Sequence, residues 1–167
     1  MELDEVIKGR MSIRKYKEIV PDIELIRKCI EAAVYAPSAM NAESWRFYIV
    51  KNKKKIEALS GTQKYSEFLK DAPYVIVIAM REGESHFLED AACAAMILML
   101  KAHELGLGTC WNAIYHPDST YREQYVRDIL NIPKKYRVVC SIGIGYPSEK
   151  IKKRTVKKFE QVAEVIS

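Results

Sequence analysis

Between a helical run and the first strand-like run, the chain reads Ala36-Pro37-Ser38-Ala39-Met40-Asn41-Ala42-Glu43-Ser44-Trp45. Proline and small polar residues at such a junction end the helix and turn the chain. Loops between rigid elements are where contacts to ligands concentrate. We therefore expect this loop to contact a ligand, together with a basic segment upstream and a basic tail downstream.

Regular elements flank the loop on both sides. An apolar stripe with Asp22 as N-cap predicts a helix over residues 22–35, and aromatic and β-branched residues predict a strand over 46–50. Further helices are predicted over 2–9, 53–59, 84–105 and about 118–130, with another turn of helix over 66–71, and further strands over 74–80, 109–115 and 138–146. Gly106 is expected to end the longest helix in a left-handed conformation.

The middle of that longest helix, residues 91–100, is apolar on every side. Such a helix is expected to be buried all round, and in a chain of 167 residues this indicates that a second subunit supplies part of the cover. Asp90 stands alone at the edge of the apolar run, which suggests a buried hydrogen-bond acceptor.

Length, charge and composition limit the classes of protein to which the chain can belong. The length of 167 residues fits one domain, 1–167, and the net charge of +5 mildly favours anionic ligands but does not indicate nucleic acid. The longest apolar run is too short to span a bilayer and no signal peptide is recognisable, so we expect a cytoplasmic protein without a membrane partner. The histidines show no metal-ligand spacing. Four widely spaced cysteines are expected to be buried free thiols: Cys29, Cys93, Cys110 and Cys140.

The basic segment upstream reads Arg10-Met11-Ser12-Ile13-Arg14-Lys15-Tyr16. If it is extended, Arg10, Ser12 and Arg14 share one side. Two guanidinium groups and a hydroxyl suit a phosphate, because arginine offers planar bidentate donors. Taken alone, the segment fits a solvated basic turn better than a phosphate site.

The two Gly-x-Gly pairs do not form a dinucleotide-binding motif. Gly106-x-Gly108 follows a helix, and Gly143-x-Gly145 runs from a strand into Pro147, so neither has the strand–turn–helix context of a dinucleotide-binding motif. No cysteine has a partner that suggests a nucleophile. If the chain is an enzyme, we expect a cofactor to carry the chemistry.

Four segments resemble, in order, the signatures of the nitroreductase family of FMN-dependent oxidoreductases. Residues 10–16 resemble the opening Arg-x-Ser-x-Arg-x-(Phe/Tyr) pattern, and residues 36–47 resemble Ala-Pro-Ser-x-x-Asn-x-Gln-Pro-Trp-x-Phe. Residues 105–111, Leu-Gly-Leu-Gly-Thr-Cys-Trp, resemble the third signature, and residues 142–147 followed by Arg154 resemble the closing one. Together the segments are specific for the family, but not for one activity within it.

The resemblance implies an α+β fold, in which a central, mostly antiparallel sheet carries helices on both faces, and an intertwined homodimer with FMN at the interface. Residues 148–167 would be a C-terminal extension that packs on the partner. The implied reaction is ping-pong: NAD(P)H reduces the flavin at N5 and a small electron-poor acceptor, such as a nitroaromatic or quinone, then takes the electrons. No side chain need act as an obligatory acid or base.

The resemblance also implies roles for individual residues. Arg10 and Ser12, with Met11 between them, would hold the FMN phosphate, and Arg154 would close on it. Arg14 would lie near the ribityl chain and the pyrimidine edge. The loop residues Pro37, Ser38 and Asn41 would contact the flavin of the other subunit. Backbone amides at Cys110, Trp111 and Asn112 would approach flavin N5 and O4.

Two residues depart from the family pattern, because Glu43 and Ser44 replace the usual Gln-Pro. An ionised glutamate cannot donate a hydrogen bond, so any amide donation at that position is lost. The short chain leaves little room for a substrate lid, and we expect an open, shallow site. A same-fold flavoenzyme with other chemistry (a dehydrogenase, dehalogenase or flavin-fragmenting enzyme) and a non-catalytic FMN-binding protein remain alternatives.

Overall fold

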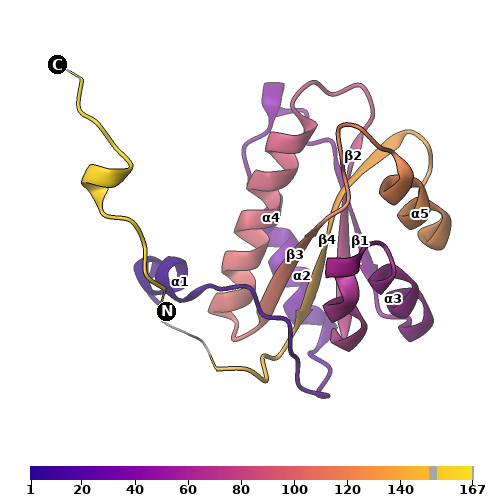
Figure 1. The fold of residues 1–167 in the computed structure, drawn as a ribbon, viewed down its shortest axis with the longest axis horizontal. Coiled ribbons are helices and arrows are strands. Elements are labelled where there is room, and N and C mark those ends of the chain that lie inside the picture. Colours follow the sequence, from indigo (N-terminus) through magenta and orange to yellow (C-terminus); the bar gives the residue numbers. More distant parts are fainter. Residues whose placement is uncertain (151–153, 167) are drawn as a thin grey trace.

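The computed structural model describes residues 1–150 and 154–166. Its centre is an antiparallel sheet of four strands in the order β1–β2–β4–β3 (Figure 1). The strands are β1 (Trp45–Val50), β2 (Tyr74–Arg81), β3 (Gly108–Ala113) and β4 (Tyr136–Gly145). β2 is buried along all but its last residue, as its continuous apolar sequence predicts.

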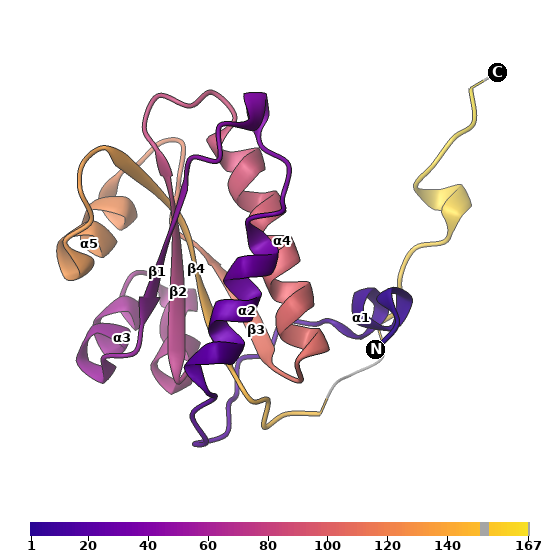
Figure 2. The same ribbon diagram turned by 180° about the vertical axis from the view of Figure 1, so that it is seen from behind.

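Helices cover both faces of this sheet, which confirms the predicted α+β architecture (Figures 1 and 2). One face carries α2 (Ile23–Ala33) and α4 (Phe87–Glu104), and the other carries α3 (Lys53–Ser60), the 3₁₀ segment η2 (Lys64–Asp71) and α5 (Tyr121–Leu130). The short α1 (Leu3–Gly9) lies near the C-terminal end of α4. The sheet therefore separates two apolar cores.

Most helix ends follow the predicted signals. Asp22 caps α2 by accepting a hydrogen bond from the Glu24 N–H at 3.0 Å, and Gly106 ends α4 with a φ of +78°. α4 begins at Phe87 rather than at residue 84, because a turn through Gly83, with a φ of +93°, joins it to β2. α5 begins at Tyr121, later than predicted, and ends at Asn131 in the left-handed conformation.

The single chain covers α4 on one side, and the expectation that a second subunit supplies the rest of the cover stays a prediction. Ala94, Ala95 and Leu98 are fully buried against the sheet and α2, but the opposite side of the helix is open. Ala92 and Cys93 are exposed there, and Met96 is 45% exposed. The other three cysteines are buried and all four are free thiols, so only Cys93 departs from the expected burial.

A buried ion pair ties α5 to the start of β4. Glu123, which is 1% exposed, accepts hydrogen bonds from Arg137 Nε at 3.0 Å and Nη2 at 2.7 Å, and from the Val138 N–H at 3.2 Å. The hydrogen bonds to Glu123 raise the pKa of Arg137. The same guanidinium lies over the Phe87 and Tyr115 rings. No periodic pattern in the sequence predicts this ion pair.

The C-terminal segment 154–166 extends away from the body of the chain (Figures 1 and 2). It holds one 3₁₀ turn, η3 (Phe159–Gln161), and its apolar residues Phe159, Val162 and Ile166 are between 63% and 92% exposed. Residues 151–153 and 167, which belong to the predicted extension, lie outside the described residues. No helix among the described residues is long and apolar enough to cross a membrane.

Candidate functional site

The basic segment 10–16 runs in an extended conformation beside β3, as predicted. Ser12 forms a parallel bridge with Thr109, and the Ile13 N–H donates to the Thr109 carbonyl at 2.9 Å. Gly108 makes this approach possible, because a Cβ at that position would lie 2.7 Å from the Ile13 side chain. The segment therefore lies against the strand that carries Cys110, Trp111 and Asn112.

Three basic side chains gather where this segment begins. Burial and the nearby Arg154 guanidinium lower the pKa of Arg10, while burial and Arg10 together lower the pKa of His103. Within the described ranges, no carboxylate forms an ion pair with Arg10, Arg14 or Arg154. Cations that repel one another without a balancing acid form a site that favours an anion. The structure thus brings together two arginines that the sequence places 144 positions apart.

Arg14 lies further along the segment, at a pocket of about 530 Å³. Aromatic side chains form much of its wall. The lining residues are Arg14, Gln63, Tyr65, Phe68, Cys110, Trp111, Asn112 and Ala113. The Arg14 backbone is held by the Glu149 carboxylate, which accepts from the Arg14 N–H at 2.7 Å. The pocket can therefore receive a flat, aromatic ligand beside one cation.

The geometry of β3 distinguishes among its three predicted site residues. The Thr109 carbonyl accepts from Ile13, and the Ala113 carbonyl accepts from Gln63 Nε2 at 3.0 Å, so both point away from β4. Backbone groups alternate along a strand, and Trp111 therefore points the same way. The Trp111 N–H therefore faces away from β4, on the side of the pocket that Trp111 lines, and the Cys110 and Asn112 amides face β4.

The Asn112 side chain serves the structure of the pocket wall. Its Oδ1 accepts from Gln63 Nε2 at 2.8 Å and Ser66 Oγ at 2.9 Å, and its Nδ2 donates to Ser141 Oγ at 2.9 Å. Asn112 thereby fixes η2, which carries Tyr65 and Phe68, against the sheet. Gln63, Tyr65 and Phe68 were missed as site residues in the sequence, where only a turn of helix was expected. The hydrogen bonds from Gln63 and Ser66 to Asn112 join segments that are distant in the sequence, so no local pattern predicts them.

Cys110 lies beside the cations but is not an activated nucleophile. Burial raises the pKa of its thiol, even though Arg14, a hydrogen bond from Ser12 and Arg10 act in the opposite direction. The thiol is therefore protonated near neutral pH. This agrees with the expectation that no cysteine carries the chemistry.

The loop of residues 36–44 is held against the other end of α4. The Asp90 carboxylate, 6% exposed, accepts from the Ala39 N–H at 3.1 and 3.2 Å, which confirms the predicted buried acceptor. The 3₁₀ segment η1 (Ala39–Asn41) follows. Met40, Asn41 and Glu43 all have positive φ angles of 45–53°, a conformation that non-glycine residues adopt at an energetic cost. Met40, at the tip, is 99% exposed.

The two departures from the family pattern have visible consequences. Glu43 accepts a hydrogen bond from Asn41 Nδ2 at 3.3 Å, and its own N–H donates to Ser38 Oγ at 3.1 Å. The glutamate therefore stabilises the loop internally and orients the Asn41 amide. Ser44 is buried, and its hydroxyl has no hydrogen-bond partner among the described residues.

One chain does not bring the loop and the basic cluster together. His103, beside Arg10, lies 13 positions after Asp90, which holds Ala39. At 1.5 Å of rise per residue, the two attachment points are separated by roughly 20 Å along α4. Pro37, Ser38 and Asn41 thus lie at one end of the helix, while Arg10, Ser12 and Arg154 lie at the other.

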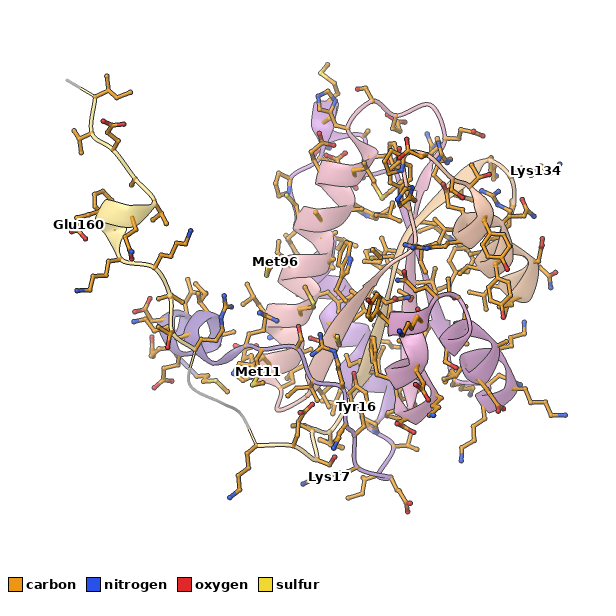
Figure 3. The ribbon with its side chains drawn as sticks, viewed as in Figure 1. Met11, Tyr16, Lys17, Met96, Lys134 and Glu160 are labelled. Carbon is orange, nitrogen blue, oxygen red and sulfur yellow. The ribbon has the colours of Figure 1, made fainter. Side chains whose placement is uncertain are left out.

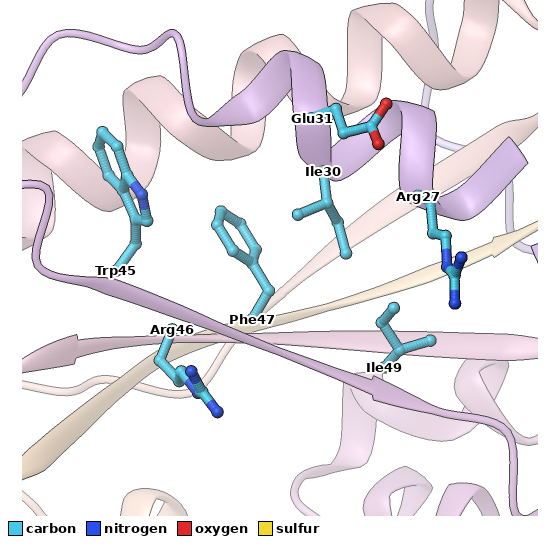
Figure 4. A pocket seen from close by; sticks show the side chains of 7 residues that line it. All are labelled: Arg27, Ile30, Glu31, Trp45, Arg46, Phe47 and Ile49. Carbon is cyan, nitrogen blue, oxygen red and sulfur yellow. The ribbon is translucent and has the colours of Figure 1, made fainter. Parts of the chain in front are cut away.

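A further pocket of about 360 Å³ lies between α2 and β1 (Figure 4). Ile30, Phe47 and Trp45 form its apolar part, and Arg27, Glu31 and Arg46 surround it. It contains none of the predicted site residues. We therefore assign it no part in the candidate site.

Comparison with known proteins supports the architecture. The profile of the nitroreductase family matches residues 7–63 and 59–146, a span that includes the basic segment, the loop and β3. The chain belongs to the nitroreductase family. As a member it is an oxidoreductase of a flavin-dependent family, and the fold identified from the four sequence segments is confirmed.

Individual relatives agree with this assignment. A protein of Methanothermobacter thermautotrophicus, provisionally named NADH dehydrogenase/NAD(P)H nitroreductase, is 33% identical over 89% of this chain and 79% of its own length. An FMN-dependent nitroreductase from Clostridium difficile R20291 has a TM-score of 0.88 and 36% identity, covering 96% of this chain and 98% of the other. An oxidised iodotyrosine deiodinase bound to FMN and 3-iodo-L-tyrosine has a TM-score of 0.77 and 25% identity, covering 99% and 97%.

Proposed function

We propose that this nitroreductase-family protein binds FMN and moves electrons from NAD(P)H to small electron-poor acceptors such as nitroaromatics or quinones. The observation that carries the proposal is a cluster of arginines, without an ion-pair partner among the described residues, beside an aromatic pocket. A phosphomonoester and a flat ring system are the two halves of FMN, and the two parts of the site suit them in turn. The named relatives support the same cofactor and donor.

The residues fit the cofactor in the following way. Arg10, Ser12 and Arg154 would hold the phosphate, with the Met11 backbone between them, and Arg14 would lie beside the ring system. The Trp111 N–H would donate to the ring, while Cys110 and Asn112 would support it from the strand. When bound, FMN supplies the redox chemistry, taking a hydride from NAD(P)H and later giving its electrons to the acceptor.

The protein's own part is binding and placement. Glu149 holds the Arg14 backbone, and the Arg14 guanidinium would place a positive charge beside the ring system, where it would stabilise negative charge on the reduced ring. Tyr65, at the rim of the pocket, is 80% exposed, so the site is open to a second flat molecule. Donor and acceptor can therefore occupy the same place one after the other, and proximity and stacking supply the catalysis.

We further propose that the active form is a homodimer. The loop residues Pro37, Ser38 and Asn41 lie too far from Arg10 within one chain to serve the same ligand, whereas a second copy can supply them. The open face of α4 around Met96, and the apolar residues of segment 154–166, offer the surface that such a dimer would bury (Figure 3). Residues 148–167 would then form an extension of the single domain that packs on the partner.

The direct test is the visible spectrum of the purified protein, followed by anaerobic mixing with NADH and with NADPH. The proposal predicts a yellow flavin band that bleaches with a nicotinamide donor and returns with a nitroaromatic or quinone. A colourless protein that also fails to bind added FMN would contradict it. A flavin band that neither donor bleaches would instead indicate a non-catalytic FMN-binding protein.

The likeness to iodotyrosine deiodinase keeps reductive dehalogenation as a second candidate. The acceptor panel should therefore include 3-iodo-L-tyrosine beside nitroaromatics and quinones. Faster reoxidation of the reduced protein by the iodinated compound would favour the second candidate.

Replacing Asn41 with leucine should weaken FMN binding by about tenfold and leave the dimer intact, because a bulky apolar side chain would replace a polar contact to the partner's flavin. Titration with FMN and sedimentation analysis measure the two properties separately. Asn131→Leu is a matched control, since Asn131 has a similar φ of +56° at the end of α5 and is remote from the site. Equal losses of FMN affinity in both variants would show that backbone strain, rather than a contact, is responsible.

A further inference from the structure

A second basic pocket, of about 940 Å³, lies beside the candidate flavin pocket. Five lysines line it, from three separate parts of the chain: Lys15, Lys17, Lys51, Lys53 and Lys70. We call this site the lysine pocket. Neither the fixed positions of the family signatures nor the proposed flavin site uses them.

The charge in the lysine pocket is poorly balanced. In the part of the chain that the structure describes, two carboxylates, Glu18 and Asp71, line it beside the five ammonium groups. Among the described residues, Lys70 is the one member with an ion pair, to Glu67 at 2.7 Å. The pocket therefore carries a net positive charge that a ligand with several negative charges would neutralise.

The backbones that carry these lysines are fixed in place. The Lys17 N–H donates to the Tyr146 carbonyl at 2.8 Å, and the Ser148 N–H donates to the Lys15 carbonyl at 3.0 Å. Asn52, between Lys51 and Lys53, caps α3 by accepting from the Lys55 N–H at 3.1 Å. Tyr16 and Ile56 are buried and form part of the floor. The floor of the pocket is thus formed before a ligand binds.

Residues that are neighbours in the chain line the lysine pocket and the flavin pocket. Arg14 lines the flavin pocket and the next residue, Lys15, lines the lysine pocket. In η2, Phe68 lines the flavin pocket, and Lys70, two positions later, lines the lysine pocket. Because neighbouring side chains of an extended segment point to opposite sides, the two pockets flank residues 14–15, and a ligand that uses both must be long enough to pass around this segment, as an extended dinucleotide is.

We propose that the lysine pocket binds the phosphorylated adenosine half of the nicotinamide donor and selects NADPH over NADH. The two donors differ by one phosphate on the adenosine ribose, and a cluster of ammonium groups recognises that added charge. The inference rests on the proposed function, since it takes the electron donor to be a nicotinamide dinucleotide. It adds the choice between the two donors, which the sequence alone leaves open.

The experiment compares two charge-reversed variants of the flavin-loaded protein. Lys51→Glu/Lys53→Glu removes two lysines of the pocket, whereas Lys54→Glu/Lys55→Glu changes the net charge equally on exposed residues of α3 that do not line it. The pocket variant should raise KM for NADPH about tenfold, change KM for NADH less than about twofold and leave kcat and FMN content unchanged. The control variant should behave as the wild type.

Calorimetry measures the affinities of 2′,5′-ADP and 5′-AMP for the lysine pocket and involves no flavin chemistry. The wild type should bind 2′,5′-ADP more tightly than 5′-AMP, and the pocket variant should lose that difference. Because this measurement needs no turnover, it remains decisive even if the protein proves to hold no flavin. Equal affinity for the two nucleotides, or equal effects of the pocket and control variants, would overturn the inference.

Discussion

Replacing Arg10 with glutamine should weaken FMN binding by about 10- to 100-fold and leave the fold unchanged. Charge-assisted hydrogen bonds to phosphate contribute roughly 1.5–3 kcal/mol each, and glutamine keeps most of the volume without the charge. In the absence of ligand the substitution costs little stability, because Arg10 has no acidic partner among the described residues and is repelled by Arg154. Quenching of flavin fluorescence on titration gives the dissociation constant.

Riboflavin provides the matched ligand for this experiment, since it lacks the phosphate. Its affinity should be nearly the same in the wild type and in Arg10→Gln. Arg27→Gln is the matched protein variant, because Arg27 lies at the separate pocket beside β1. An equal loss for riboflavin and FMN would place Arg10 at the ring rather than at the phosphate and would contradict the proposed orientation.

The pKa of His103 gives a test of the same basic cluster in the absence of any ligand. Burial lowers its pKa and Arg10 lowers it further, because a protonated imidazole is disfavoured both by loss of water and by a neighbouring cation. Arg10→Gln removes the second cause, so the pKa of His103 should rise in the variant. NMR titration of the imidazole measures this change, and an unchanged pKa would show that the two groups are not close in solution.

Replacing Glu123 with alanine should lower the free energy of unfolding by about 3–5 kcal/mol, the range typical of breaking a buried ion pair. The loss includes three accepted hydrogen bonds and leaves the partly buried Arg137 guanidinium without its carboxylate. Urea denaturation of the flavin-free protein measures it. FMN affinity should not change, because the pair joins α5 to β4 and does not line the flavin pocket.

The control for this substitution is Asp128→Ala on the same helix. Asp128 is exposed and accepts from Gln124 across one turn, so its loss should cost less than about 1 kcal/mol. A hydrophobic pair, Glu123→Leu with Arg137→Met, should recover part of the stability by removing both charges together. A loss for Glu123→Ala as small as that for Asp128→Ala would mean that the ion pair is dispensable.

Much of the fold follows from local sequence signals. The apolar run of β2, the Asp22 cap and the Gly106 helix end each act over a few residues, and each gives the predicted structure. The start of α4 was misplaced because Gly83 turns a stretch that otherwise suits a helix. The hydrophobicity of α4 shows which side chains avoid water, but not whether the same chain covers them.

The site was predictable where it depends on contiguous motifs and unpredictable where distant segments meet. Residues 10–14 lie extended beside β3, as expected from their alternation, and Asp90 is the expected buried acceptor. Gln63 and Phe68 enter the pocket through hydrogen bonds that join η2 to Asn112, a pairing without a sequence pattern. The lysine pocket is formed from three segments, each of which alone reads as a solvated charged surface.

The separation of the loop and the basic cluster along α4 has a thermodynamic consequence. If each flavin is bound by groups from two chains, association of the chains and binding of FMN are linked equilibria. The apparent FMN affinity then falls when the protein is diluted below the dissociation constant of the dimer, and added FMN in turn strengthens the dimer. In such a system the cofactor is also part of the assembly that retains it.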